Sequence, residues 1–195
     1  MTLDEQKQCF LNIAKSNIKR EGIDALLDYL QKSDFFEAPA STKFHSAVAG
    51  GLCAHSINVY NRFVKNLQNE YGDNWQDVIS LESATLIALF HDICKVNVYK
   101  IDYRNVKEDG VWVQKPFYSF SDPLPYGHGE KSVYIINGFL RLTREEAMTI
   151  NWHMGAFDSR VKGGFLGLEN VYYTYPTALI FHLSDVQATY LEEKM

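Results

Sequence analysis

The segment at residues 81–95, LESATLIALFHDICK, constrains the fold of this chain more than any other stretch. Its residues are apolar almost all round the helix that they would form, which is typical of a helix buried inside a bundle. Ser80 is a suitable N-cap, and Glu82 suits the first turn. The segment contains His91 and Asp92, and a buried carboxylate is costly unless it is paired or bound to a metal. We therefore expect a helical bundle with a polar site inside it.

Helical periodicity continues on both sides of this segment. Residues 4–17 and 22–32 repeat their apolar positions with a helical period. The pair Gly50-Gly51 indicates a close backbone approach or a late helix start, and Thr143 opens a T-x-x-E capping box. Further helices are expected at residues 48–71, 128–141, 143–152 and 176–193, whereas the glycine-rich stretch 154–170 is expected to be irregular.

Residues 97–119 have a different character, because Val, Tyr, Ile and Trp alternate there with polar residues. The pair Asp109-Gly110 lies between two alternating runs, and this arrangement predicts a β-hairpin. A loop with two prolines follows, up to residue 127. The chain has 195 residues, about the size of one domain. We expect a single domain over residues 1–195, with N-terminal helices in 1–40 and a hairpin and loop insertion at 97–127.

The composition excludes several classes of protein. Nineteen Lys and Arg residues against 24 Asp and Glu give a net charge of −5, so the chain is not built to coat nucleic acid by bulk charge. The longest apolar run, residues 84–90, is far shorter than the roughly 20 residues of a membrane span. The N-terminus lacks the apolar region of a signal peptide. Three cysteines without CxxC spacing fit a reducing cytoplasm, and Cys53 and Cys94 are expected to be small core residues.

Two groups of polar residues interrupt apolar helices. An ion pair between Asp92 and Lys95 would account for the carboxylate but not for His91, which falls on the apolar stripe. A metal would account for both, and imidazole with carboxylate suits Mn, Fe, Zn, Ni or Co better than Ca or Mg. His182 and Asp185 stand three residues apart in the last apolar helix. They would share a metal, or, as we favour, Asp185 alone is a ligand and His182 bonds elsewhere.

The histidines form an ordered series along the chain. A lone histidine is most often a surface or hydrogen-bonded core residue, but here the order is His55, His91-Asp92, His128, His153 and Asp185, each in a helix or at a helix end. This series resembles the HD-domain superfamily of metal-dependent phosphohydrolases, and FHDICK is similar to its HD-x-x-K variant. The resemblance covers about residues 44–190. It is closest to the HD domain of YhaM-type 3′–5′ exoribonucleases and to hairpin-bearing HD proteins of phage and prophage genomes.

The resemblance implies an all-α HD-domain helical bundle with a small β-hairpin insertion at about 97–119. It also implies a centre for two divalent transition-metal ions, with Mn or Fe favoured over Ni, Co or Zn. Lys95 would contact the scissile phosphate or orient the nucleophile. Asp92 would bridge the two metals, the first held by His55, His91, Asp92 and Asp185 and the second by His128 and His153.

Three further residues are candidates for substrate contacts. His45 precedes the His55 helix at a place where the resemblance often has a histidine, and an exposed loop histidine is the alternative. Arg62 would reach a phosphate unless it is a surface residue. Asp158 would accept the outer N–H of His153, as a carboxylate near a metal-bound histidine often does, unless it caps a turn.

The resemblance implies a metal-dependent phosphohydrolase that cleaves a phosphoester or phosphodiester of a nucleotide or short single-stranded nucleic acid by metal-activated hydroxide. Tyr99, Tyr103 and Trp112 of the hairpin would stack on bases, unless the hairpin is an ordinary one with a packed face. Two alternatives stay open: an HD-type di-iron oxygenase of a small molecule, and a metal-dependent nucleotide-binding module without turnover. We expect a cytoplasmic protein with no membrane association, and an oligomer is compatible with the sequence.

Overall fold

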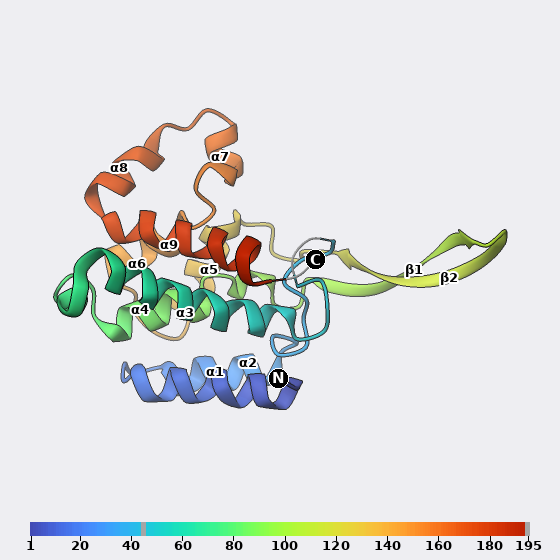
Figure 1. The fold of residues 1–195 in the computed structure, drawn as a ribbon, viewed down its shortest axis with the longest axis horizontal. Helices are drawn as coiled ribbons and strands as arrows, with labels where there is room; N and C mark the ends of the chain where they lie inside the picture. The colour runs from blue at the N-terminus through green and yellow to red at the C-terminus, as the bar shows by residue number, and fades with distance from the viewer. Residues whose placement is uncertain (44–45, 194–195) are drawn as a thin grey trace.

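The computed structural model describes residues 1–43 and 46–193. Within them the chain is mostly helical and carries a two-stranded antiparallel hairpin, as predicted (Figure 1). The longer helices are α1 (Leu3–Asn17), α2 (Ile23–Lys32), α3 (Gly51–Tyr71), α4 (Leu81–Phe90), α5 (His128–Asn137), α6 (Arg144–Asn151), α8 (Gly167–Thr174) and α9 (Pro176–Gln187). The strands are β1 (Tyr99–Glu108) and β2 (Val111–Phe120), and short helical turns lie at η1 (Gly72–Asp77), η2 (Ile93–Lys95), η3 (Gly155–Phe157), α7 (Ser159–Lys162) and η4 (Ala188–Glu192).

Helix α4 runs through the middle of the bundle. Every side chain from Ala84 to Phe90 is buried, and α1, α3 and α6 pack around the helix. Phe10 of α1 meets Phe90 edge-on with ring centroids 5.8 Å apart, and Phe63 of α3 meets Phe181 of α9 at 5.0 Å. Burial of side chains of this size contributes about 1.5–3 kcal/mol each. The core therefore fixes the position of the C-terminal end of α4, where the polar residues begin.

The end of α4 differs from the predicted helix at residues 81–95. Ser80 caps its start as expected, because its hydroxyl accepts from the backbone N–H of Ser83. The α-helix stops at Phe90, however, and the backbone N–H of Lys95 bonds to the carbonyl of Asp92, only three residues back. This tighter turn ends the regular helix, so the expectation of one continuous helix is wrong beyond Phe90.

Two glycines determine where α3 begins. Gly50 is the N-cap and has a φ of +76°, a conformation that favours glycine. A Cβ on Gly51 would lie 2.0 Å from the carbonyl oxygen of Ser46, so only glycine fits there. Both expectations for this pair are confirmed, since α3 starts late and its first residue touches another backbone segment.

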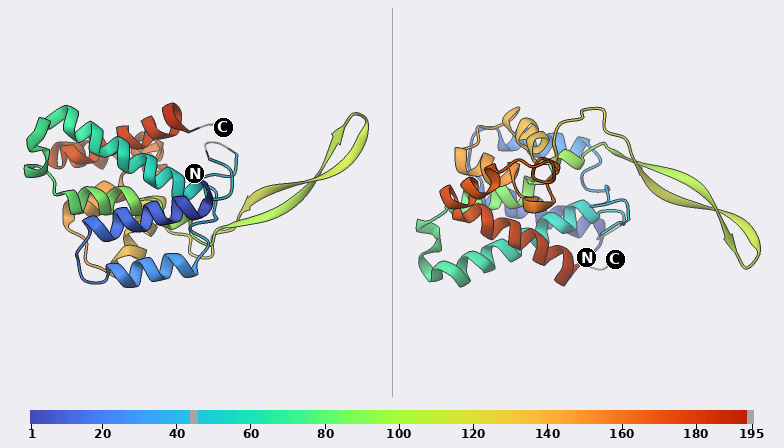
Figure 2. Two further views of the ribbon diagram at one scale, coloured as in Figure 1. Left: turned by 60° about the horizontal axis from the view of Figure 1, so that its bottom comes forward. Right: turned by 90° about the horizontal axis from the view of Figure 1, so that it is seen from above.

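The hairpin extends away from the helical body as a long arm (Figures 1 and 2). Its register pairs Tyr99 with Phe120 at the root and Glu108 with Val111 at the tip. Asp109 and Gly110 form the turn with φ values of +48° and +88°, the double positive φ of a type I′ hairpin turn. The predicted hairpin and its turn are therefore confirmed.

The C-terminal third is more regular than expected. The Thr143 capping box of α6 is present, with hydrogen bonds in both directions to Glu146. The stretch 154–170, which was expected to be irregular, contains α7 and the start of α8. Residues 168–174 contain no glycine, so the helix α8 can form there. None of the helices in the described ranges is long and apolar enough to cross a membrane.

Candidate metal centre

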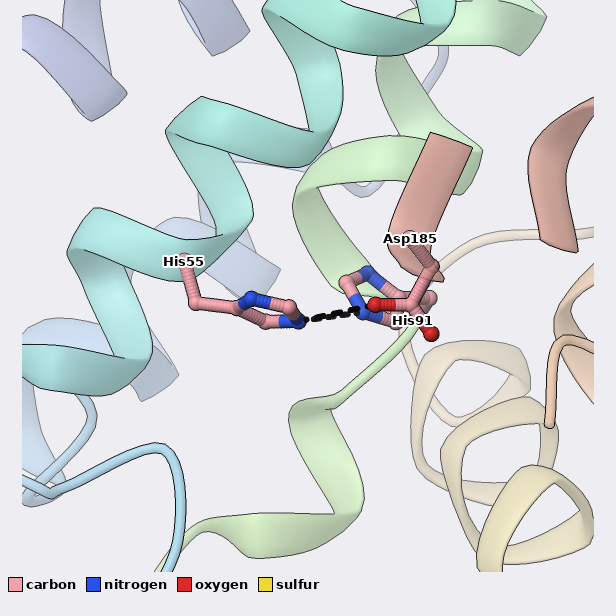
Figure 3. Close-up of side chains that lie close together, drawn as sticks. All are labelled: His55, His91 and Asp185. Carbon is pink, nitrogen blue, oxygen red and sulfur yellow. Dashed lines mark hydrogen bonds and ion pairs between the residues drawn. The ribbon is translucent and has the colours of Figure 1, made fainter. Parts of the chain in front are cut away.

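All six predicted metal ligands meet at one place in the bundle. His55 comes from the middle of α3, His91 and Asp92 follow the end of α4, and Asp185 comes from α9. Figure 3 shows how the side chains of His55, His91 and Asp185 point toward one another from these elements. His128 is the first residue of α5, and His153 lies two residues beyond the end of α6. The cluster therefore joins five helices that are far apart in the sequence.

The first part of the cluster surrounds the Nε2 atom of His55. This atom lies 3.3 Å from Nε2 of His91 and 3.2 Å from Oδ1 of Asp185. Asp92 contributes Oδ2 at 3.6 Å from the same nitrogen. His55 and His91 are buried, and the Asp185 side chain is 14 % exposed. The side chains expected to hold a first metal are thus brought together.

The second part surrounds the carboxylate of Asp92. Its Oδ1 atom lies 2.8 Å from Nε2 of His128 and 3.5 Å from Nε2 of His153. Its Oδ2 atom accepts a hydrogen bond of 2.6 Å from Nζ of Lys95. The Asp92–Lys95 ion pair considered from the sequence is therefore present, but it occupies one oxygen only. The other oxygen faces His128 and His153, so Asp92 lies between the two groups of ligands.

Hydrogen bonds fix which nitrogen of each buried imidazole carries the proton. Nδ1 of His91 bonds to the carbonyl of Ala88 at 2.9 Å, and Nδ1 of His153 bonds to the carbonyl of Ile150 at 2.7 Å. A carbonyl only accepts, so each Nδ1 is the donor and each neutral ring keeps its lone pair on Nε2. Both Nε2 atoms point toward oxygens of Asp92 at distances of 3.6 and 3.5 Å. Because His91 is neutral, the lone pair of its Nε2 atom faces a carboxylate oxygen of Asp92 without a proton between them.

The charges follow from this arrangement. Burial lowers the pKa of His91 to about 3, so this ring is neutral at pH 7. Burial alone would raise the pKa of Asp92, but Lys95 and a hydrogen bond with His128 hold it well below its usual range. Burial also opposes the charged form of His55, yet hydrogen bonds to Asp185 and Glu193 raise its pKa to about 10. Burial likewise opposes the charged form of His128, yet contacts with Cys94 and Asp92 raise its pKa to about 10. Protons on His55 and His128, together with the ammonium of Lys95, therefore balance the carboxylates.

The donor set fits a divalent transition metal. Three groups of side chains place their ligand atoms within 4.8 Å of one another: His55, His91 and Asp185; His91, Asp92 and His153; and Asp92, Cys94 and His128. Neutral imidazoles with carboxylates are ligands of Zn, Fe, Mn, Co or Ni. A cation among these atoms would replace the protons of His55 and His128 and meet the Nε2 atoms of His91 and His153. The buried His, Asp and Cys groups are therefore compatible with a metal site.

Cys94 is closer to the cluster than the sequence suggested. Its Sγ atom lies 3.4 Å from Nδ1 of His128, and its backbone N–H donates to Oγ of Ser132. The thiol is buried, as expected, but it is not simply a core residue because it packs against a predicted ligand. Periodicity placed it away from His91, and nothing in the spacing indicated that His128 would arrive from α5.

Glu193 is the second contributor that the sequence did not reveal. Its Oε1 atom lies 2.8 Å from Nδ1 of His55 and its side chain is almost completely buried. A carboxylate on the outer nitrogen of a metal-bound histidine fixes the ring and raises its basicity. Such a partner was expected from Asp158 on His153, and it comes from the C-terminal end of the chain to His55 instead.

The other expected site residues do not all have the contacts predicted for them. His182 bonds elsewhere, as favoured, because its Nδ1 donates to the carbonyl of His153 at 2.7 Å. Asp158 caps α7 and pairs with Arg160 at 2.7 Å, which is the turn-capping alternative. Its expected role toward His153 is wrong, since the Ile150 carbonyl accepts that N–H. Arg62 pairs with Glu192, and His45 lies outside the described residues.

A cavity of about 600 Å³ opens onto the cluster. Five of the six predicted ligands, all except His91, line it together with Lys95 and Lys162. The rest of its wall is largely apolar, and neither Arg62 nor Asp158 belongs to the described residues that line it. The apolar side chains are Tyr99 and Phe120 at the root of the arm, Met154, Phe157, Val186 and Tyr190.

Comparisons of the chain with protein-family models, with curated proteins and with solved structures find no match.

Proposed function

We propose that this protein is an HD-type, metal-dependent phosphohydrolase that acts on a nucleotide or a short single-stranded nucleic acid. One observation carries the proposal: six side chains in the order typical of HD domains converge at one end of a cavity. Four imidazoles and two carboxylates face one another there over distances of 2.8 to 3.6 Å. The cavity has a volume in the usual range of small-molecule sites, about 300–1,000 Å³.

The arrangement supports two metal positions that share Asp92. His55, His91 and Asp185 would hold the first ion, and His128 and His153 would hold the second, with Asp92 between them. Bound divalent metals in such a centre lower the pKa of water toward about 7 and offset charge on phosphate oxygens. The carbonyls of Ala88 and Ile150 and the carboxylate of Glu193 would keep three of the imidazoles in the orientation that metal binding requires.

Lys95 is suited to a role beside the metals. Its ammonium has three donors, and Asp92 accepts from one of them. Burial opposes its charged form, but Asp92 outweighs this effect and raises the pKa of Lys95, so it stays protonated at neutral pH. Because Lys95 also lines the cavity, its remaining donors are available to orient a phosphate oxygen next to the carboxylate.

The apolar end of the cavity favours a nucleotide over a small polar phosphoester. Tyr99, Phe120 and Phe157 offer aromatic surface to a base, and base–aromatic stacking contributes about 1–3 kcal/mol. Lys162 provides a second cation on the same wall. A base against these rings would leave its phosphate near the histidine cluster.

The proposal is tested by measuring product release from a mixed panel after Mn²⁺ loading. The panel contains single-stranded RNA and DNA, dinucleotides, cyclic nucleotides, and nucleoside mono- and triphosphates. Release by the native protein but not by Asp92→Ala is the expected result, and the product identifies the bond that is cut. Asp28→Ala is the matched control, because Asp28 is an exposed residue of α2 paired only with Lys32 among the contacts described.

Failure would be informative if metal content is measured in the same samples. Two bound metals without any product would contradict phosphohydrolase activity on these substrates. Oxygen consumption by the iron-loaded protein would then favour an oxygenase, and nucleotide binding without turnover would favour a binding module.

A further inference from the structure

The two halves of the buried cluster differ in the chemistry of their ligand atoms. The half drawn in Figure 3 combines two imidazoles with the carboxylate of Asp185, and Asp92 provides a second carboxylate beside it. The half around His128 also includes the carboxylate of Asp92, and it adds the thiol of Cys94. The second half therefore offers a soft donor, sulfur, where the first half offers a further carboxylate.

The fold holds the thiol of Cys94 beside His128. Cys94 lies in the turn η2, and its backbone N–H donates to Oγ of Ser132 at 3.2 Å. Ser132 is about one turn after His128 in α5, so the helix that carries the imidazole also fixes the turn that carries the thiol. Gly129 lets this helix approach closely, because a Cβ there would lie 2.2 Å from the carbonyl oxygen of Asn151. The position of the sulfur is thus set by the packing of α5.

The separations within this group are close to those around a tetrahedral metal ion. Sγ of Cys94 lies 3.8 Å from Nε2 of His128, and the same nitrogen lies 2.8 Å from Oδ1 of Asp92. Zinc ligands of these types bind at about 2.0–2.3 Å, which places them about 3.4–3.6 Å from one another in a tetrahedron. The ligand atoms of all three residues lie within 4.8 Å of one another. Small adjustments of the side chains would therefore bring three donors onto one ion.

The thiol of Cys94 is screened from the cavity. The residue is 4 % exposed, and it is not among the described residues that line the cavity, whereas His128 and Asp92 are. A substrate in the cavity would meet these two side chains rather than the sulfur, which argues against Cys94 as a nucleophile. A metal ligand needs no such access. A donor on the inner side leaves the cavity side of the ion open to water and substrate, as catalytic metal sites require.

A thiolate ligand changes which metal a position prefers. Thiolate and imidazole are ligands that suit Zn²⁺, whereas carboxylates suit Mn²⁺. The affinity of most sites for divalent metals already rises from Mn²⁺ through Fe²⁺ to Co²⁺, and a sulfur donor widens this difference because Mn²⁺ is the hardest of these ions. The half of the cluster around His128 is therefore suited to a softer ion than the half around His55.

From these observations we propose that Cys94 is a metal ligand, which joins Asp92 and His128 as a thiolate and makes the second metal position selective for Zn²⁺ over Mn²⁺. On binding, the S–H bond of the thiol breaks, its proton passes to solvent, and a lone pair of the sulfur forms the bond to the metal. This inference rests on the metal centre of the proposed function, but it does not depend on which reaction the centre performs.

The test is the absorption spectrum of the protein loaded with Co²⁺, which replaces Zn²⁺ and reports its ligands. Cobalt bound to a thiolate has an intense sulfur-to-metal charge-transfer band in the near ultraviolet, whereas nitrogen and oxygen ligands give only weak ligand-field bands. The native protein is expected to show this band for one of its two bound equivalents, and Cys94→Ala is expected to lose it. Cys53→Ala is the matched control and is expected to keep the band. Cys53 is also buried, but it belongs to none of the metal-ligand groups found among the described residues.

A second variant guards against misfolding of Cys94→Ala. The chain has three cysteines, so a band that is retained when Cys9 and Cys53 are both replaced by alanine assigns the sulfur to Cys94. Cobalt bound to the native protein without the band, or a band that survives in Cys94→Ala, would overturn the proposal and leave the metal centre standing. A native protein that binds no cobalt would overturn the metal centre and this ligand together.

Competition between Zn²⁺ and Mn²⁺ tests the selectivity separately. Loss of an outer partner of a metal ligand costs about 10–100-fold in metal affinity, so loss of a direct ligand is expected to cost at least about tenfold for Zn²⁺. Because Mn²⁺ gains less from sulfur, the preference of the second position for Zn²⁺ is expected to fall in Cys94→Ala and to stay the same in Cys53→Ala. An unchanged preference in Cys94→Ala would overturn the selectivity.

Discussion

The buried cluster and the hairpin arm break the usual distribution of residues in opposite ways. Around Asp92, imidazoles and carboxylates lie in the core, where apolar side chains are the rule. Along the arm, aromatic side chains such as Trp112 lie in solvent, where polar ones are expected. The second half of α4 shows neither anomaly, because its residues from Ala84 to Phe90 are buried and nearly all apolar.

The two regions differ in the kind of partner that would stabilise them. A buried lone pair needs a hydrogen-bond donor or a cation, since its desolvation is otherwise uncompensated, and the clustered imidazoles and carboxylates are compatible with metal ions. An exposed apolar face is typical of a surface that another molecule covers, so the arm points outward from its own chain.

Replacement of Asp92 by Asn is expected to have the largest effect. The amide is nearly the same size but neither bridges two metals nor carries the charge that balances them. Outer partners of metal ligands already cost up to about 100-fold, so we expect a loss of about 1,000-fold or more in kcat/KM, equivalent to about 4 kcal/mol. Steady-state kinetics of the Mn²⁺-loaded proteins measures this effect. Retention of a tenth of the activity would contradict the central position of Asp92.

Glu146 is a buried carboxylate whose charge is balanced within the chain, by Arg20. Arg20 donates to both carboxylate oxygens of Glu146, at 2.7 and 2.8 Å, and Glu146 is fully buried. Breaking such a pair leaves an uncompensated charge, so Arg20→Ala is expected to lower the free energy of unfolding by about 3 kcal/mol. The exposed pair Lys32–Asp28 is the control, and Lys32→Ala is expected to cost less than about 1 kcal/mol.

The same pair gives a pH dependence with a definite sign. Burial alone would raise the pKa of Glu146, but hydrogen bonds from Arg20 and the Thr143 cap hold it below the usual value of a glutamate. A carboxyl whose pKa is lowered on folding stabilises the protein above its unfolded pKa and loses that effect as the pH falls through the folded pKa. Urea unfolding at a series of pH values below about 4.5 is expected to show a shallower loss of stability in Glu146→Gln. An unchanged pH profile would contradict the assignment.

Metal binding is expected to stabilise the fold. At a metal concentration 100 times the Kd, binding to the native state alone adds about 2.7 kcal/mol, which for a chain of this size is a rise in Tm of about 5–11 °C. Thermal unfolding with Mn²⁺ and after chelation measures this shift. Asp92→Asn is expected to show little of it, and an equal shift in both proteins would indicate binding elsewhere.

Glu193→Gln is expected to weaken metal binding without abolishing it. The amide keeps the size of the side chain but removes the charge that supports His55 through its Nδ1 atom. Loss of such an outer partner typically costs about 10–100-fold in metal affinity. Isothermal titration with Mn²⁺ measures the change in metal affinity. An unchanged affinity would mean that Glu193 only anchors its segment to α3 and does not support metal binding by His55.

Shortening the arm, by replacing residues 101–118 with Asn-Gly between the paired residues Lys100 and Ser119, is expected to have the smallest effect on the helical body. Its residues lie outside the core, and surface changes away from special features stay within about 0.5 kcal/mol. The free energy of unfolding, compared under conditions where both proteins are monomeric, is therefore expected to be nearly the same. A loss of several kcal/mol would show that the arm supports the body of its own chain.

Local sequence patterns predicted much of the fold. Periodicity located most helices, Ser80 and Thr143 marked two helix starts, and the Asp109-Gly110 pair located the hairpin turn. These features depend on neighbours in the sequence, so they can be recognised without a structure. The end of α4 at Phe90 was not recognised, because residues 91–95 leave the helix to meet groups from α5 and α6 rather than for a local reason.

The site was predictable in its members but not in its surroundings. The order of His55, His91-Asp92, His128, His153 and Asp185 identified residues that the fold does bring together. Glu193 and Cys94 were missed because their contacts with His55 and His128 join segments 138 and 34 residues apart, with no motif to mark them. Asp158 was misassigned for the converse reason: its neighbour in sequence, Arg160, takes its carboxylate.

Metal content per chain tests the central claim most directly. The native protein and Asp92→Asn would be stripped with a chelator, loaded with Mn²⁺, passed through a desalting column and measured by elemental mass spectrometry beside the protein concentration. We expect two equivalents of metal in the native protein and at most one in the variant. A native protein that retains no metal, or a variant that retains as much, would contradict the assignment of this buried cluster as a metal centre.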